Sequence, residues 1–319
     1  MFRKISMKKI VYVTGCLGFI GFHVAKKCLD AGWYVYGIDN MSYAANPALL
    51  DEFWGYDNFR FENKDINDVK KLVHCDYVIN CAAETHVDNS IEDSNIFVHS
   101  NINGVHNLLE LIRQQSGKKP TLLHFSTDEV YGDIDAGSFT ETQLLKPSNP
   151  YSATKAAADM LITAWARTHN VPFIIVRPTN NYGIGQYVEK LIPKTIKYLN
   201  LGRQVPLHMN GTPRRTWLHV EDTADAVMAI IEHGTVGEIY NISGNYETSN
   251  IDVVHQIIDN MMLTTEYAAH IDFDYQRAGA DVRYSINDDK LKALGWTPTR
   301  IFKDELPAIV DYYNNNFVW

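Results

Sequence analysis

Residues 9–15 read KIVYVTG and lead directly into TGCLGFIG at residues 14–21. The first stretch is a short apolar run rich in β-branched residues, and the second has glycines at three-residue intervals. Apolar side chains at helical spacing follow. In a strand–turn–helix of this kind, Gly15 permits the tight turn, Gly18 lets the backbone approach a pyrophosphate, and Gly21 allows the helix to pack closely on the strand. The segment therefore predicts a dinucleotide-binding unit.

Further β-rich runs follow this unit and alternate with helical patterns. These runs cover residues 33–39, 59–65, 77–83, 121–127 and 173–178. Helical patterns fill most of the gaps, notably residues 94–115 and 151–169. Strands that alternate with helices form βαβ units, so the sequence predicts an α/β protein with a Rossmann-type doubly wound parallel sheet.

The chain is expected to form this sheet domain and a smaller C-terminal lobe. We assign residues 7–178 to the Rossmann domain and expect residues 217–245 to return to it. Residues 179–216 and 246–319 are left for a substrate-binding lobe. We place the lobe over the carboxyl edge of the sheet, where ligands bind in open α/β folds.

Local signals refine the second half of the chain. Several glycines and prolines in residues 181–216 predict a loop-rich segment. A helix is expected over residues 222–233, with Asp222 as its N-cap and Gly234 just past its end. Residues 239–243 read as one more strand.

The composition excludes several classes of protein. The chain of 319 residues is 45% hydrophobic, and its net charge of −9 argues against a nucleic-acid surface. No apolar run approaches the roughly 20 residues of a membrane span, and the N-terminal apolar stretch is too short for a signal peptide. The cysteines form no CxxC pair and have no zinc-like spacing, so we expect reduced thiols, no bound metal and a cytoplasmic protein. They are Cys16, Cys28, Cys75 and Cys81.

Two acidic residues follow early strands at places that suit a dinucleotide. Asp39 ends the second strand, where its carboxylate can accept hydrogen bonds from an adenosine ribose. It would repel a 2′-phosphate, which favours NAD over NADP. Asp65 follows the third strand and has two interpretations: it hydrogen-bonds the adenine amine, or it is the N-cap of a helix over residues 66–73.

Tyr151 and Lys155 are spaced i, i+4 at the start of a predicted helix, so both side chains lie on one face. A lysine cation beside a phenol lowers the pKa of the phenol, which can then accept a proton from an alcohol. Thr127 ends the preceding strand and can hydrogen-bond the same alcohol. The alternative is a solvated helix face, which is what such spacing usually means.

The segment STDEVYG at residues 126–132 carries adjacent carboxylates at Asp128 and Glu129. They are either solvated or placed for chemistry, and both reach one substrate only if the chain bends after Thr127. Oxidation of an alcohol to a ketone acidifies the neighbouring C–H. A glutamate can then remove that proton, and a protonated aspartic acid can donate to a departing hydroxyl. The pair is suited to β-elimination of water.

Over nearly its whole length the sequence resembles the extended short-chain dehydrogenase/reductase family, and within it the nucleotide-sugar 4,6-dehydratases. Those enzymes carry the same Thr-Asp-Glu segment, and Thr127, Tyr151 and Lys155 match the family's catalytic set. Other matching stretches are AAETHVDNSI at 82–91, NNYGIGQYVEKLIP at 180–193, RTWLHVEDTADA at 215–226 and YNISGNYETSNIDVV at 240–254.

The resemblance implies a lyase with bound NAD and a nucleotide-diphospho-glucose substrate. Tyr151 takes the proton of the glucose 4-hydroxyl, assisted by Lys155 and Thr127, while hydride passes from C4 to NAD⁺. Glu129 removes the C5 proton and Asp128 protonates the leaving 6-hydroxyl. The hydride then returns to C6, and the product is a nucleotide-linked 4-keto-6-deoxy-glucose.

The family pattern also implies two sets of binding residues. Expected cofactor contacts are Gly15, Gly18, Phe19, Ile20, Gly21, Asp39, Asn40, Asp65, Ile66, Ala82, Ala83, Tyr151 and Lys155. Expected substrate contacts are His86, Asn180, Lys190, Leu191, Pro206, His208, Arg215, Asn250 and Arg277. The alternative for the two arginines is surface charge, and for His208 it is packing within the lobe.

The nucleotide base stays open between thymine and uracil. Bacterial dTDP-glucose enzymes usually have His where Ala280 stands and often Tyr where His208 stands. Residues 143–156 and 291–300 look closer to the eukaryotic UDP-glucose 4,6-dehydratases that begin UDP-rhamnose synthesis.

The family implies a homodimer formed by the helices predicted at residues 94–115 and 151–169. Their candidate contact residues are Leu108, Leu109, Ile112, Met160, Leu161 and Trp165, with burial in this subunit's own core as the alternative. Two other functions are weighed against the lyase. A nucleotide-sugar 4-epimerase would leave Asp128 and Glu129 idle, and a non-catalytic NAD-sensing protein is disfavoured by the intact catalytic set.

Overall fold

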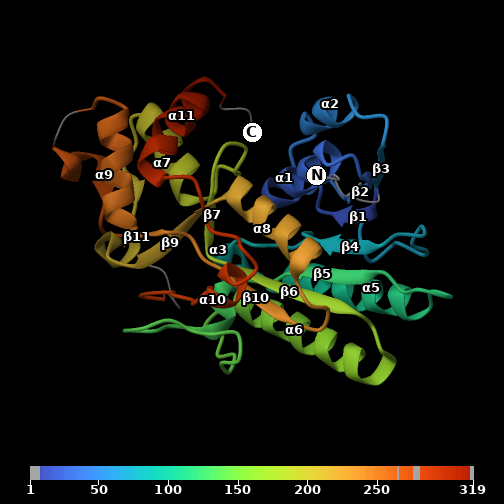
Figure 1. The fold of residues 1–319 in the computed structure, drawn as a ribbon. Helices are drawn as coiled ribbons and strands as arrows, with labels where there is room; N and C mark the ends of the chain where they lie inside the picture. The colour runs from blue at the N-terminus through green and yellow to red at the C-terminus, as the bar shows by residue number, and fades with distance from the viewer. Residues whose placement is uncertain (1–7, 264–265, 276–280, 317–319) are drawn as a thin grey trace.

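The computed structural model describes residues 8–263, 266–275 and 281–316. Its largest feature is a seven-stranded sheet in the order β10-β6-β5-β4-β1-β2-β3 (Figure 1). All neighbouring strands in it are parallel. The strands are β1 (Ile10–Thr14), β2 (Tyr34–Asp39), β3 (Phe59–Asn63), β4 (Tyr77–Asn80), β5 (Thr121–Phe125), β6 (Phe173–Pro178) and β10 (Ile239–Ile242).

This order confirms the predicted fold class. From β1 the chain moves outward to β2 and β3, then returns to place β4 on the other side of β1. The strand order therefore reverses between β1 and β4, and this reversal opens a crevice at the carboxyl ends of the strands.

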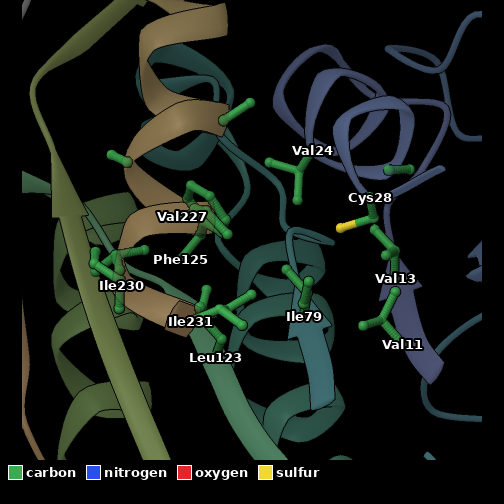
Figure 2. Close-up of a cluster of buried hydrophobic side chains, with 14 of the residues drawn as sticks. Val11, Val13, Val24, Cys28, Ile79, Leu123, Phe125, Val227, Ile230 and Ile231 are labelled. Atoms are coloured by element: carbon green, nitrogen blue, oxygen red, sulfur yellow. The ribbon is translucent and has the colours of Figure 1, made fainter. Parts of the chain in front are cut away.

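Helices cover both faces of the sheet and bury its alternating side chains. On one face, α1 (Phe19–Asp30) and α8 (Val220–His233) pack over Val11 and Val13 of β1 (Figure 2). Between these two valines, Tyr12 points to the other face, where α5 (Gly104–Arg113) and α6 (Pro150–His169) cover it. Successive strand residues point to opposite faces, so one strand contributes to two apolar cores.

The two long helices of the second face differ in regularity. α6 begins at Pro150 behind an Asn149–Ser152 capping box and ends at His169, close to the predicted bounds. The helix expected over residues 94–115 is instead α4 (Asn95–Phe97), the π-helical η1 (Val98–Asn103) and α5. Within η1, the Asn101 side chain donates to the Glu84 carbonyl and the Thr154 hydroxyl.

The start of α8 differs from the prediction. The helix begins at Val220, and the His219 ring accepts from the Glu221 N–H as its N-cap. Asp222 lies within the first turn, where it accepts hydrogen bonds from Thr299 and Arg300. Asp222 therefore binds a distant segment of the chain and is not the N-cap. Gly234 follows the helix, as predicted.

The second half of the chain adds a small sheet, a strand pair and helices around a third apolar cluster. These strands are β7 (Asn180–Tyr182), β9 (Arg214–His219) and β11 (Tyr246–Ser249), with the pair β8 (Val205–Pro206) and β12 (Ile271–Asp272). These helices are α7 (Leu191–Asn200), α9 (Asn250–Asn260) and α11 (Phe302–Asn315). The expectation of a loop-rich segment over 181–216 is wrong, because α7, β8 and parts of β7 and β9 lie there.

Several short elements complete the chain. They are α2 (Leu49–Phe53), α3 (Val87–Glu92), α10 (Asp289–Lys292) and the 3-10 turns η2 (Asp128–Tyr131), η3 (His208–Gly211) and η4 (Tyr267–His270). Near α10, Leu291 and Trp296 pack into the core that α1 and α8 share, so part of residues 246–319 lies against the Rossmann domain. The division into two domains stays a prediction.

The structure pairs none of the four cysteines in a disulfide. Within the described ranges there is no grouping of three or more His, Cys, Asp or Glu side chains suited to a metal ion. No helix in those ranges has the length and apolar character to cross a membrane.

Three of the candidate dimer residues are buried inside the subunit. Leu108, Leu109 and Ile112 are each 0% exposed in the core under α5 and α6. Their burial in this subunit's own core, the alternative interpretation, is therefore correct. Met160 on α6 is 63% exposed, and Trp165 is partly buried with its indole N–H donating to Glu110.

Gly21 tests how closely α1 packs on the turn before it. A Cβ at this position would lie 1.9 Å from the Gly15 carbonyl oxygen, which belongs to the backbone. We expect Gly21→Ala to lower the free energy of unfolding by about 1–3 kcal/mol or more, because the turn must shift. In Gly55→Ala the added Cβ would lie 3.5 Å from its nearest neighbour, so this control should unfold near the wild-type urea midpoint. Equal midpoints for both variants would contradict the tight packing.

Candidate functional site

A pocket lies at the carboxyl edge of the large sheet, in the crevice between β1 and β4. It is bordered by the β1–α1 turn, the ends of β2, β4 and β5, the start of α6 and the segment after β6. Predicted cofactor residues in its lining are Gly15, Gly18, Phe19, Ile20, Gly21, Asp39, Asn40, Asp65, Ile66, Ala82, Ala83 and Tyr151. The same lining includes Thr127, Asp128 and Glu129.

The glycine turn leaves room for a bound phosphate. Gly15 has φ +68°, and a Cβ there would lie 2.7 Å from the Ala82 amide nitrogen. No side chain caps the first turn of α1, which starts after Gly18. The first turn of α1, with its backbone N–H groups and the positive end of the helix dipole, therefore borders the pocket, an arrangement that fits a dinucleotide pyrophosphate.

Asp39 stands in the pocket wall, and its two oxygens hold the turns around it. Oδ2 accepts from the Leu17 N–H at 2.9 Å, and Oδ1 accepts from the Met41 N–H at 2.8 Å. Burial raises the pKa of this carboxyl, and the backbone donors oppose that rise. An ionised carboxylate has lone pairs beyond these two bonds, so contact with a ribose remains a prediction.

Asp65 is not a helix cap. Residues 66–68 form a turn and residues 69–73 have no regular structure, and the Asp65 side chain accepts from the Asn67 N–H at 2.8 Å. Its second oxygen accepts from the Asn40 side chain at 3.0 Å. Asp65 therefore joins two lining loops of the pocket.

The chain bends after Thr127, as the adjacent carboxylates required. Thr127 is extended, with φ −154°, and the 3-10 turn η2 begins at the next residue. The Thr127 hydroxyl donates to Asp128 Oδ1 at 3.2 Å and accepts from the Glu129 N–H at 3.3 Å. This turn brings both acids and Thr127 to one pocket, so the solvated-charge interpretation is wrong for Asp128.

Asp128 is a buried acid with a high affinity for its proton. Its side chain is 3% exposed, and within the described part of the chain its Oδ2 has no hydrogen-bond partner. Burial and the neighbouring charge of Glu129 raise the pKa of Asp128 to about 7, against the opposing charge of Arg215. Near neutral pH the group can therefore hold a proton and release it.

Tyr151 and Lys155 are both buried on α6, which excludes a solvated helix face. The Tyr151 hydroxyl hydrogen-bonds Thr127, and burial followed by the charges of Glu129 and Asp128 raises the pKa of the phenol. Lys155 Nζ donates to the Phe125 carbonyl at 2.5 Å. The action of Lys155 on the phenol stays a prediction.

A chain of buried polar groups behind the pocket reaches Lys155. Thr14 donates to Asn80 Oδ1 at 2.6 Å, Asn80 Nδ2 is 3.0 Å from His124 Nδ1, and His124 Nε2 is 3.5 Å from Lys155 Nζ. Burial lowers the pKa of Lys155 to about 8. Sequence reasoning missed these residues, although each is a polar residue at or near the end of a buried strand.

The predicted substrate residues divide into two groups. Asn180 and Lys190 line the pocket, and Lys190 Nζ donates to the Thr85 carbonyl at 3.0 Å. The following lie outside the lining: His86 at the N-cap of α3, Leu191 at the start of α7, Pro206 in β8, His208 in η3 and Asn250 at the start of α9. Arg277 lies outside the described residues.

Arg215 is buried, so the surface-charge interpretation is wrong for it. Its side chain is 6% exposed, and its guanidinium stacks 4.4 Å from the Tyr284 ring centre. It donates to the Asp281 carbonyl at 3.0 Å. Sequence reasoning assigned no role to Tyr284 or Asp281, although both lie in QRAGADVRY at 276–284, a stretch that departs from the bacterial pattern.

The pocket also contains acids that sequence reasoning missed. Glu84 is 8% exposed, and burial, with Glu189 nearby, raises the pKa of its carboxyl. Glu189 forms an ion pair with Lys190 at 3.0 Å. Glu84 was visible in AAETHVDNSI as a charged residue between apolar and small neighbours.

The sequence profile of the family described as GDP-mannose 4,6 dehydratase matches residues 12–307. The chain belongs to this family. The fold, the glycine turn and the Thr-Asp-Glu segment in the pocket agree with membership in the GDP-mannose 4,6 dehydratase family.

Two curated proteins are similar to the chain over nearly all its length. The low-salt glycan biosynthesis protein Agl12 of Haloferax volcanii is 41% identical, over 95% of this chain and 98% of that protein. The dTDP-glucose 4,6-dehydratase of Neisseria meningitidis is 38% identical, over 98% of this chain and 95% of that protein.

Solved structures show the same similarity. DesIV, the dTDP-glucose 4,6-dehydratase of Streptomyces venezuelae crystallised with NAD and TYD, is 34% identical with a TM-score of 0.91, over 96% of this chain and 97% of that one. The UDP-glucuronic acid 4-epimerase of Bacillus cereus, crystallised with UDP-glucuronic acid and NAD, is more distant. It is 25% identical with a TM-score of 0.88, over 96% of this chain and 99% of that one.

The raised pKa of Asp128 predicts a pH-dependent cost to folding. The pKa of Asp128 is about 7 in the folded state, whereas an ordinary aspartic acid has 3.8, so folding favours the protonated acid. The protonated acid contributes to the free energy of unfolding fully below about pH 4, and this contribution is lost as the pH rises through 7. We expect Asp128→Asn to gain stability relative to wild type between pH 4 and 7, with a constant difference above pH 7.

Urea unfolding at intervals from pH 4 to pH 8 measures this difference. Asp135→Asn is the control, because it removes an exposed carboxylate a few residues away. A stability difference for Asp128→Asn that does not vary with pH would contradict the raised pKa.

Proposed function

We propose that the protein is an NAD-dependent nucleotide-sugar 4,6-dehydratase, a hydro-lyase that forms a 4-keto-6-deoxy sugar. One observation carries the proposal: Asp128, buried with a pKa of about 7, shares a pocket with Glu129, Thr127 and Tyr151. Removal of water needs a proton donor and a proton acceptor together. Epimerisation at C4 needs neither acid.

NAD, when bound, supplies the hydride acceptor for C4 and the hydride donor for C6. The residues that would hold it are the glycine turn, with N–H groups for the pyrophosphate, and Asp39 and Asp65 on the adenosine side. The carboxylate of Asp39 selects NAD over NADP because it repels a 2′-phosphate.

Each catalytic side chain has one task. Tyr151 in its phenolate form, which the positive charges of Lys155 and of bound NAD⁺ would favour, takes the proton of the sugar 4-hydroxyl. Thr127, which is hydrogen-bonded to Tyr151, hydrogen-bonds the same hydroxyl. Glu129 takes the proton from C5, which a ketone at C4 has acidified. Asp128 gives its proton to the departing 6-hydroxyl, so that water leaves instead of hydroxide. Lys155 donates a hydrogen bond to the Phe125 carbonyl at the end of β5 and is the last member of the catalytic set.

We propose dTDP-glucose as the favoured substrate and UDP-glucose as the alternative. Similarity to the Neisseria meningitidis and Streptomyces venezuelae dTDP-glucose enzymes supports the first. The departures at His208 and Ala280 support the second. The lobe residues Asn180 and Lys190 would contact the nucleotide-sugar, as they line the pocket.

Incubation of purified protein with dTDP-glucose and with UDP-glucose tests the function. We expect a 4-keto-6-deoxy product that absorbs in alkali and no net reduction of NAD. A UDP-galactose product would instead identify a 4-epimerase, and absence of turnover with either nucleotide would favour an NAD-sensing protein. The ratio of kcat/KM for the two substrates shows whether the enzyme prefers thymine or uracil as the nucleotide base.

Replacement of Glu129 by glutamine tests its role as the C5 base. The variant keeps the shape of the side chain but cannot accept a proton, so we expect dehydration to fall by about 10²–10⁴-fold. The variant should still bind NAD and still oxidise the sugar at C4. The transient NADH that this oxidation forms is measured by its absorbance at 340 nm. Glu92→Gln, which changes an exposed carboxylate on the surface, is the control. Unchanged dehydration in Glu129→Gln would remove the assigned role.

We also propose a cytoplasmic homodimer. Exposed apolar side chains on neighbouring segments support the dimer: Ile96 on α4, Val98 on η1 and Met160 on α6 are 48%, 41% and 63% exposed. Four free cysteines, of which three are buried, agree with a reducing compartment. Sedimentation equilibrium should give twice the mass of one chain, and Met160→Lys should lower the association constant.

A further inference from the structure

Glu129 contacts a buried tyrosine as well as the pocket. Its Oε2 lies 3.4 Å from the hydroxyl oxygen of Tyr284. Tyr284 is 3% exposed and is not part of the pocket lining. The Glu129 carboxyl therefore has a polar partner outside the space where a sugar would bind.

The contacts continue from Tyr284 to the surface. The Tyr284 hydroxyl donates to Asp281 Oδ2, and the same oxygen accepts from Ser148 Oγ at 2.5 Å. Asp281 is 3% exposed and also shares a hydrogen bond with the Asp133 carboxyl. Ser148 and Asp133 are both exposed. One continuous line of oxygen atoms thus joins the pocket to solvent.

Neighbouring groups hold this line in place. The Arg215 guanidinium stacks on the Tyr284 ring and donates to the Asp281 carbonyl. The backbone N–H of residue 282 donates to Asp133 Oδ1 at 2.8 Å. Burial raises the pKa of Tyr284, so its hydroxyl stays protonated and passes on one proton only as it receives another.

We propose that Tyr284 and Asp281 relay the proton that Glu129 takes from C5 out to solvent, an inference that rests on the dehydratase function proposed above. The O–H bond of protonated Glu129 breaks as its proton bonds to the Tyr284 oxygen. The original Tyr284 proton passes at the same time to Asp281 Oδ2. Glu129 ends as a carboxylate, Tyr284 is unchanged, and Asp281 exchanges its new proton with solvent beside Ser148 and Asp133.

The relay decides the origin of the hydrogen at C5 of the product. With the relay intact, Glu129 returns a solvent proton to C5. With it broken, the proton that left the substrate remains on Glu129 and goes back. Tyr284 and Asp281 act through Glu129, so they are positioning residues and not catalytic ones.

The experiment converts protiated dTDP-glucose in D₂O and measures deuterium at C5 of the product by mass spectrometry and NMR. We expect wild type to incorporate deuterium at C5. Tyr284→Phe keeps the ring under Arg215 but lacks the hydroxyl, so most of its product should retain protium at C5. Asp281→Asn should do the same. UDP-glucose replaces dTDP-glucose if it is the better substrate.

Two controls separate the relay from a general effect on structure. Tyr240→Phe removes another buried hydroxyl, one that accepts from the Thr235 N–H, and should leave deuterium incorporation at the wild-type level. The double variant Ser148→Ala, Asp133→Asn changes only the exposed end of the line, which protects the test if a buried variant does not fold. Part of the product of this double variant should retain protium at C5.

The outcomes distinguish the relay from the function on which it rests. Absence of dehydration by wild type would overturn the proposed function. Dehydration by wild type without deuterium at C5 would overturn the relay and leave the function standing. Full incorporation by Tyr284→Phe, Asp281→Asn and the surface double variant would likewise overturn the relay, however much their rates fall.

Discussion

The turn after Thr127 is the constraint on which the site depends. A regular strand would send Asp128 and Glu129 to opposite faces of the sheet, so the strand has to end before them. The chain leaves β5 at Phe125, and the 3-10 turn η2 brings both acids to one pocket. Burial of Asp128 beside a second carboxylate is unfavourable for its ionised form, which is why this acid keeps a proton near neutral pH.

A buried ion pair supports that turn from behind. Arg177 on β6 and Asp159 on α6 lie 2.9 Å apart, at 2% exposure each. Asp159 also accepts from the Ser126 hydroxyl, and Arg177 donates to the Tyr131 hydroxyl, so the pair holds both ends of the turn. Loss of one partner of such a pair leaves an uncompensated buried charge, which costs about 3–5 kcal/mol. The Arg177–Asp159 ion pair therefore fixes the geometry of the turn more than it adds to the free energy of unfolding.

Much of this could be predicted from sequence because the signals are local. The strand runs and the glycine turn need only neighbouring residues, and α6 carries its own capping box at Asn149. The errors arose where distant residues compete. Asp222 has the composition of an N-cap, but Thr299 and Arg300 take its oxygens and the His219 ring caps α8 in its place. The spacing of Lys155 and Tyr151 also could not predict that the Lys155 ammonium group donates to the Phe125 carbonyl.

The sequence by itself determined the fold class, the position of the dinucleotide turn and the residue types at the site, since periodicity and glycine spacing are properties of short segments. Only the tertiary structure decided which charges are buried and which groups they face. The proton affinity of Asp128, the stacking of Arg215 on Tyr284 and the line from Glu129 to the surface each join residues from separate parts of the chain. Burial and electrostatic interaction depend on distance in space, and separation along the chain does not fix that distance.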